Sequence, residues 1–142
     1  MKLNIYKTLS AAIIILALAV PAEAADVMTV AKKAGPAVVL IETYLEDMPL
    51  GLGSGFIVEA SGTVVTNYHV IEYAEKATVT LTNGKTYDVK GVFAYDNERD
   101  IAVLDINGKN LPALELGDSD DLEVGDDIVA IGNPEGLDNT VS

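Results

Sequence analysis

The chain has 142 residues, a length that suits one small domain, and a formal net charge of −13. Such an acidic chain repels phosphate backbones, which argues against nucleic acid as a partner. It contains no cysteine, so disulfides, thiolate catalysis and cysteine-based zinc sites are excluded.

The N-terminus has the pattern of a secretory signal peptide. Lys2 and Lys7 precede an almost wholly apolar run over residues 9–20, and an Ala-x-Ala site ends at Ala24. The run is shorter than the roughly 20 apolar residues that span a bilayer, although an uncleaved membrane anchor is the alternative. We therefore predict a signal peptide over 1–24, cleavage before Ala25, and a periplasmic or secreted bacterial protein with no stable membrane span.

Residues 25–142 predict a mostly β domain after one short helix. The spacing of apolar residues predicts a helix over 26–34, which Gly35 and Pro36 would end. Residues 60–62 and the pair Asn83-Gly84 predict hairpin turns. Residues 46–53, rich in glycine and with one proline, predict a mobile loop. Strands are expected over 37–43, 55–59, 63–67, 77–82, 86–93, 101–106 and 128–131.

Six or seven short strands at regular spacing, separated by turn signals, are typical of an all-β barrel or sandwich. The runs at 101–106 and 128–131 are continuously apolar, as expected for strands buried on both faces or closed into a barrel. Barrel closure would remove exposed strand edges. The fold class is therefore all-β.

Two residues are candidates for general acid–base chemistry. His69 is the only histidine, it follows a predicted strand, and its type titrates near neutral pH, as a general base must. Asp100 directly precedes a predicted core strand, and a carboxylate buried there would need a partner. A histidine that donates its Nδ1–H to this carboxylate would satisfy it and fix its own tautomer. The alternative is that each is an ordinary surface residue.

Several long motifs follow one another along the chain. They are Gly53-Ser54-Gly55-Phe56-Ile57-Val58, Val65-Thr66-Asn67-Tyr68-His69-Val70, Asp100-Ile101-Ala102-Val103-Leu104, Leu116-Gly117-Asp118-Ser119 with Val124-Gly125, and Ala130-Ile131-Gly132-Asn133-Pro134. In these motifs and their order, the chain closely resembles the HtrA/DegP family of trypsin-like serine proteases. The resemblance runs from about Val27 to Ser142.

This resemblance implies the N-terminal β-barrel of a chymotrypsin-like double barrel, with His69 as general base and Asp100 as its orienting carboxylate. It implies an exported protease that degrades unfolded proteins, assembles as trimers or larger oligomers, carries PDZ domains and needs no cofactor or metal. The nucleophile would lie in a later Gly-Asn-Ser-Gly-Gly segment, which these 142 residues do not contain. We expect this polypeptide alone to be inactive.

Other readings of particular residues stay open at this stage. Ser54 precedes the histidine in a Gly-x-Gly-Ser-Gly stretch, and we interpret it as a turn residue. Ser119 lies between two aspartates, which would disfavour an alkoxide. The acidic stretch 118–127 is interpreted as a solvated turn in preference to a calcium site. The alternative function is a non-catalytic barrel that binds peptides or partners, either a pseudoprotease or a gene fragment.

Overall fold

The computed structural model describes residues 27–133 and 140–142. The predicted signal peptide over 1–24, its cleavage site before Ala25, and Asp26 lie outside the described residues. Within the described ranges, no helix is long and apolar enough to span a membrane.

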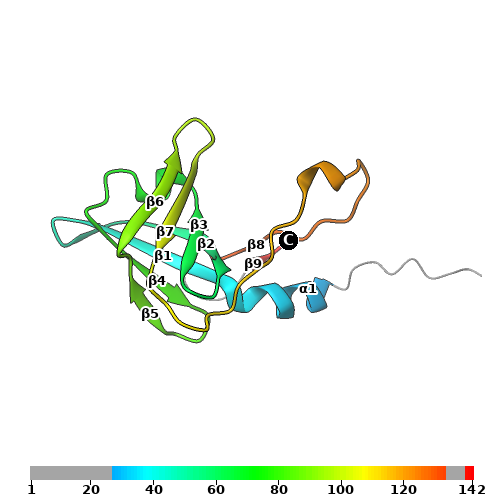
Figure 1. The fold of residues 1–142 in the computed structure, drawn as a ribbon, viewed down its shortest axis with the longest axis horizontal. Helices are drawn as coiled ribbons and strands as arrows, with labels where there is room; N and C mark the ends of the chain where they lie inside the picture. Colours follow the sequence, from blue (N-terminus) through cyan, green and yellow to red (C-terminus); the bar gives the residue numbers. More distant parts are fainter. Residues whose placement is uncertain (1–26, 134–139) are drawn as a thin grey trace, which may run out of the picture.

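A short helix leads into the sheet (Figure 1). Helix α1 covers Val27–Ala34, and Lys32 and Lys33 occupy its last turn, where positive charge favours the helix dipole. The 3-10 turn η1, Gly35–Ala37, follows because Pro36 cannot extend an α-helix. The predicted helix and its end are confirmed over the described residues.

Within residues 27–133, seven strands form one antiparallel sheet in the order β5-β4-β1-β2-β3-β7-β6. Its connections are mostly tight hairpins, and Gly84, with φ of 81°, makes the predicted turn after β4. The strands are β1 Val38–Leu45, β2 Met48–Glu59, β3 Thr63–Thr66, β4 Lys76–Leu81, β5 Thr86–Asp88, β6 Gly91–Asp96 and β7 Ile101–Asp105.

The two edge strands of the sheet, β5 and β6, are consecutive in the chain, and the sheet is curled (Figure 1). Between them, the Val89 amide donates to the Ala77 carbonyl of β4 at 2.9 Å, and the Lys90 amide donates to the Asp105 carbonyl of β7 at 2.7 Å. The prediction of one continuous strand over 86–93 is therefore wrong. The two residues between β5 and β6 thus bond to β4 and β7, the strands next to the two edges, as the chain passes from one edge to the other.

The core lies inside the curl and comes from the inward faces of all the central strands. In β4, Val79 and Leu81 are buried as the alternating pattern predicted, while Thr78 and Thr80 are half-exposed. The core cluster is Val39, Ile41, Ile57, Val64, Val79, Leu81, Ala102, Leu104, Ile106 and Leu111. The predicted all-β barrel preceded by a short helix is confirmed.

The hairpin between β1 and β2 is longer than expected. Residues 46–53 were predicted as a mobile loop, but β2 begins at Met48, which pairs with Leu45. Only Glu46 and Asp47 form the turn, and both have positive φ. Cross-strand hydrogen bonds to β1 override the weak strand preference of glycine and proline. Pro49 is accommodated beside a register shift, where a missing amide costs little.

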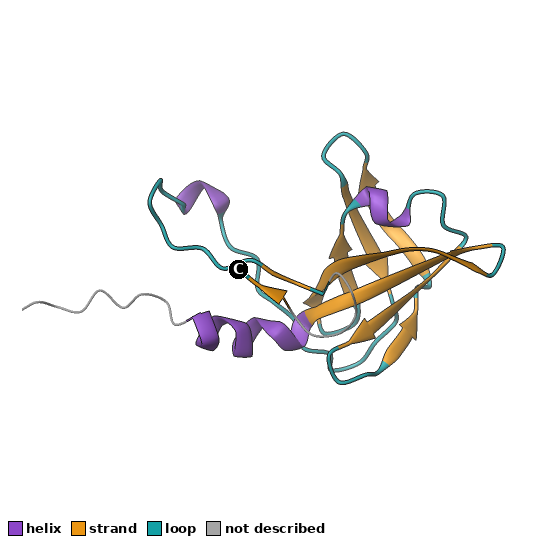
Figure 2. Ribbon diagram, turned by 180° about the vertical axis from the view of Figure 1, so that it is seen from behind, coloured by secondary structure: helices purple, strands orange, loops and turns teal. Residues whose placement is uncertain are grey.

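The C-terminal part of the described chain leaves the barrel and returns alongside α1 (Figure 2). It contains the 3-10 turn η2, Ser119–Asp121, and a small sheet of β8, Ile131–Gly132, with β9, Thr140–Val141. The predicted strand over 128–131 is wrong for its first three residues, and Ile128 is 75% exposed. Within the described residues these three lie outside the seven-stranded sheet and pack less tightly than the sequence suggested.

Candidate active site

The end of β3 presents His69 on a single helical turn. Thr66, the last residue of β3, donates from its hydroxyl to the Ser54 carbonyl of β2 at 2.8 Å. Asn67 has an extended backbone, and helix α2, Tyr68–Ile71, follows at once. The strand and its anchor on β2 therefore fix where the histidine leaves the barrel.

The turn from β6 to β7 presents Asp100. The Arg99 backbone amide and guanidinium donate to the Asp96 carboxylate, at 3.0 and 2.7 Å, which closes the turn. Asp100 has a φ of 54°, a left-handed conformation that aspartate tolerates better than most residues. This conformation directs the chain into β7 immediately after the carboxylate.

The structure brings His69 and Asp100 into direct contact across 31 positions of sequence. Asp100 Oδ2 lies 2.6 Å from His69 Nδ1, and the His69 backbone amide donates to Asp100 Oδ1 at 2.8 Å. The Asn67 side-chain amide also donates to the Asp100 carbonyl at 3.0 Å. The predicted proximity is confirmed, and the catalytic roles stay a prediction.

The expectation that the Asp100 carboxylate is buried is wrong. Its side chain is 41% exposed and that of His69 is 67% exposed. Asp100 is the last residue of the turn before β7, and the described residues leave part of its side chain exposed. The carboxylate is held by two hydrogen bonds rather than by burial, because each of its oxygens accepts one N–H.

The hydrogen bonds from His69 hold the pKa of Asp100 below its usual range. The backbone amide of His69 contributes most, followed by its ring, and the Tyr68 amide adds a smaller effect. Each donor favours the charged carboxylate. Asp100 is therefore suited to remain ionised and to orient the imidazole, which would then keep its proton on Nδ1.

A testable consequence is acid sensitivity of the fold. A folded pKa below the unfolded value stabilises the native state above about pH 4, and this contribution is lost as pH falls through the folded pKa. The stability difference between wild type and Asp100→Asn should therefore shrink as the solution is acidified. Urea unfolding across that range measures it, with Asp121→Asn in η2 as the control for loss of one charge. A difference independent of pH would contradict the expectation.

Ser54 is not the turn residue that the sequence suggested. It lies within β2, and its hydroxyl accepts a hydrogen bond from the Asn133 backbone amide at 2.8 Å. The glycines on either side of Ser54 allow close packing. A Cβ on Gly53 would lie 2.5 Å from Val70, and one on Gly55 would lie 2.8 Å from the Val65 carbonyl. Ser54 thus serves as a strand anchor beside the site.

The acidic stretch after Leu116 forms local turns. Asp118 accepts from the Asp120 amide at 3.0 Å, at the start of η2, and Asp126 accepts from the Glu123 amide at 2.8 Å. Ser119 is the first residue of η2, between the same aspartates. These bonds support the interpretation of the stretch as a set of solvated turns.

An apolar groove borders the His–Asp pair. Its volume is about 580 Å³, and α1, the second half of β2, the end of β3 and β8 line it. Its lining includes Asn67, two residues before His69, and Ile101, directly after Asp100. Its other lining residues are mainly aliphatic and include Val30, Val38, Val65, Leu114, Val129 and Ile131.

The sequence and the fold of this chain are matched by known proteins. A family profile described as a trypsin-like peptidase domain matches residues 53–142, more than half of the chain. The chain belongs to the trypsin-like peptidases. Its relatives within them are HtrA/DegP-type serine proteases, as the sequence motifs indicated.

Among the relatives of this trypsin-like peptidase, a probable periplasmic serine endoprotease DegP-like of Chlamydia muridarum is 51% identical over 90 residues, which are 63% of this chain and 18% of that protein. The putative serine protease HhoB of Synechocystis is 48% identical over 92 residues, or 65% of this chain and 22% of that protein. The chain therefore spans about a fifth of the length of these relatives.

Solved structures agree with the fold of this peptidase. The crystal structure of the serine endoprotease from Yersinia pestis superposes with a TM-score of 0.73 at 36% identity. The match covers 81% of this chain and 42% of the other. The β-barrel described above is thus a trypsin-like fold.

Two supporting contacts of the candidate site were not predicted from the sequence. Asn67 stood out only as part of a motif, yet its side-chain amide donates to the Asp100 carbonyl. The Tyr68 and Tyr95 rings stack at 5.2 Å between centroids. An asparagine or tyrosine one or two positions before a candidate base is only a weak indication of a supporting contact. The sequence does not show which distant residue such a side chain contacts.

Proposed function

We propose that this chain supplies the general base and its orienting carboxylate to an exported HtrA-type serine endopeptidase. The observation that carries the proposal is the two-point contact between His69 and the Asp100 carboxylate, at 2.6 Å and 2.8 Å. One bond holds the backbone of His69 and the other holds its ring nitrogen, so the same carboxylate constrains both the residue and its imidazole. A free histidine on a surface turn would have neither constraint.

In the proposed mechanism, Asp100 accepts the Nδ1–H of His69 and leaves the Nε2 lone pair available. His69 removes the proton from a serine hydroxyl as that oxygen attacks the peptide carbonyl, and then returns the proton to the leaving amine. Asp100 stays ionised and stabilises the imidazolium formed between these steps. Water repeats the sequence to release the acyl group. We propose no cofactor and no metal.

We propose that the nucleophile lies outside residues 1–142. The Ser54 hydroxyl accepts a hydrogen bond from the Asn133 amide, and the Ser61 hydroxyl donates one to the Glu59 carboxylate. Ser119 lies between two aspartates, whose negative charge disfavours an alkoxide. The oxyanion hole of trypsin-like enzymes accompanies the nucleophile. The apolar groove beside β2 and β3 fits the same proposal, since a second barrel packed there would cover it.

The experiment that tests this is casein degradation by the purified 142-residue polypeptide and its His69→Ala variant. We expect equal background in both, because removing the nucleophile alone costs about 10⁶-fold in turnover in well-studied triads. Turnover that disappears with His69→Ala would show that a serine within these residues acts as the nucleophile. That result would overturn the proposed division of the triad.

The proposal includes export and substrate class. The relatives from Chlamydia muridarum and Halomonas elongata are named periplasmic endoproteases. We propose that the protein acts in the periplasm on unfolded or misfolded proteins, in protein quality control, as a trimer-based homo-oligomer. The motif Ala22-Glu23-Ala24 after an apolar run supports export to the periplasm.

Export is tested by expression in a bacterial host and N-terminal sequencing of the product. We expect a periplasmic protein that begins at Ala25, because signal peptidase cleaves after small residues at the −1 and −3 positions. An Ala24→Pro variant, which should block cleavage, provides the matched control. A periplasmic wild-type product that begins at Met1 would make residues 9–20 a membrane anchor.

A further inference from the structure

Two tyrosine rings stack beside the His–Asp pair. Tyr68 is the first residue of α2 and directly precedes His69, and Tyr95 lies on β6 in the hairpin that ends at Asp100. Their ring centroids are 5.2 Å apart with an interplanar angle of 24°. This geometry is an offset stack of the kind that aromatic side chains prefer. It joins the same two segments that His69 and Asp100 join.

The polar links between these segments converge on one residue. The Asn67 amide, the His69 amide and the His69 ring all bind Asp100, through its carbonyl or carboxylate. Helix α2 has a single turn, and no side chain caps its start. Val70, the residue after His69, also packs closely against Gly53 of β2. On the residue before His69, the tyrosine stack adds a contact with β6, and this contact limits rotation of the turn about Asp100.

A β-bulge places Tyr95 on the face where it can reach Tyr68. The register between β6 and β7 shifts between Val92 and Ala94, so Tyr95 pairs with Ala102. Opposed residues of an antiparallel pair share a face, and Ala102 faces the core. Without the extra residue, Tyr95 would pair with Ile101 and project to the other face. Bulges next to active sites commonly redirect a side chain in this way.

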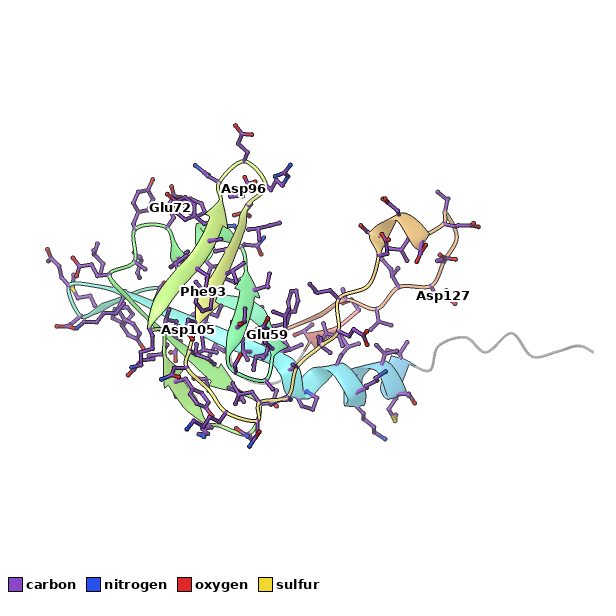
Figure 3. The ribbon with its side chains drawn as sticks, viewed as in Figure 1. Glu59, Glu72, Phe93, Asp96, Asp105 and Asp127 are labelled. Carbon is purple, nitrogen blue, oxygen red and sulfur yellow. The ribbon has the colours of Figure 1, made fainter. Side chains whose placement is uncertain are left out.

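Because Tyr95 is largely exposed, it contributes to the structure through its stack with Tyr68 rather than through core packing. Tyr95 is 65% exposed and Phe93, within the bulge on the same strand, is 64% exposed. Neither belongs to the core cluster. Figure 3 shows Asp96, which follows Tyr95, at the same end of the barrel as Glu72 after α2, whereas Phe93 lies toward Asp105 at the other end. Phe93 is therefore a matched aromatic that does not border the site.

We propose that Tyr95 is a positioning residue for His69. Its ring, redirected by the bulge at Phe93, holds Tyr68 and so fixes the orientation of the imidazole relative to Asp100. The consequence for catalysis rests on the proposed protease function, whereas the consequence for His69 geometry does not. Tyr95 acts through Tyr68, on the turn that carries the base.

The test is the tautomer of His69 in the 142-residue chain, measured by the nitrogen chemical shifts of the imidazole at about pH 8, where an ordinary imidazole is neutral. Because the sequence contains one histidine, its ring signals need no further assignment. We expect wild type, Tyr95→Phe and Phe93→Ala to show one ring environment with the proton on Nδ1. Tyr95→Ala should lose that preference and show averaged ring signals. Ring signals in Tyr95→Ala that match wild type would overturn the proposal.

Two further measurements keep the outcome decisive. Urea unfolding shows whether Tyr95→Ala is folded, and Tyr95→Leu replaces it if it is not, since leucine keeps apolar bulk but cannot stack. In a longer protein that carries the nucleophile, Tyr95→Ala should lower kcat by roughly tenfold or more with KM little changed, and Tyr95→Phe should restore it, because small misplacements of a catalytic group cost up to about 100-fold. If no version of the longer protein degrades casein, wild type included, the proposed protease function is wrong. The proposed effect of Tyr95 on His69 geometry is tested separately by the ring signals.

Discussion

In a protein where this chain continues into a nucleophilic serine, His69→Ala should lower kcat/KM by about 10⁴- to 10⁶-fold. Triad members act as a unit, so loss of the base costs nearly as much as loss of the whole triad. The remaining rate would come from the oxyanion hole and substrate binding. The measurement is cleavage of unfolded casein, with KM determined separately to show that binding persists.

Asp100→Asn should cost about 10⁴-fold, for a reason that the geometry makes specific. The carboxylate accepts two N–H groups, one on each oxygen. An asparagine offers one acceptor and one amide donor, so either the His69 amide loses its partner or the ring must accept at Nδ1. In the second case the ring carries its proton on Nε2, although Nε2 needs a lone pair to remove the proton from the serine hydroxyl. Asparagine tolerates the positive φ at this position, so the backbone should survive.

Glu98→Gln provides the matched control, because it changes an exposed carboxylate to an amide two residues before Asp100 on the same turn. It should retain activity within about twofold, as surface substitutions usually do. If either His69→Ala or Asp100→Asn kept activity within tenfold of wild type, the residue changed in that variant would not have its proposed role. The fold and the family membership would be unaffected by that result.

The sequence predicted the parts of this structure that local patterns determine. Alternation identified β4, Asn83-Gly84 identified its turn, and the strand-end positions of His69 and Asp100 led to a contact that the structure confirms at 2.6 Å. These features depend on residue type and spacing within a few positions, or on motifs shared with a known family.

The sequence failed where pairing with distant strands decides the outcome. The glycine- and proline-containing segment from Met48 became strand because β1 supplies its hydrogen bonds. The apparent strand over 86–93 was divided because acceptors on β4 and β7 hold its middle residues. The bulge in β6 that redirects Tyr95 has no local marker. The periodicity of apolar residues in one segment does not show which distant strand its backbone pairs with.

Gly53→Ala should destabilise the fold by about 1–3 kcal/mol, a large part of the roughly 5–15 kcal/mol that small domains possess. A Cβ on Gly53 would lie 2.5 and 2.6 Å from the two γ carbons of Val70 and 3.1 Å from its Cβ. Rotation of Val70 cannot relieve this contact, because both branches and the stem are close. Urea unfolding of the 142-residue chain measures the loss.

The matched control is Gly91→Ala on the edge strand β6, where a Cβ would meet nothing within 4 Å. It should be neutral or slightly stabilising, by up to about 1 kcal/mol, because alanine restricts the unfolded chain. The double variant Gly53→Ala/Val70→Ala should recover part of the loss, since it removes the atoms that clash. Equal stability of Gly53→Ala and Gly91→Ala would contradict the close approach.

This prediction links the fold to the site through adjacent residues. Val70 follows His69 directly, and it seats α2 against β2 only because position 53 has no side chain. A variant that folds despite the added methyl must move α2 outward, away from β2. We therefore expect Gly53→Ala to disturb the His69 ring signals even under conditions where the protein is fully folded. The glycine is needed at this position for the space it leaves, since its backbone conformation is open to other residues.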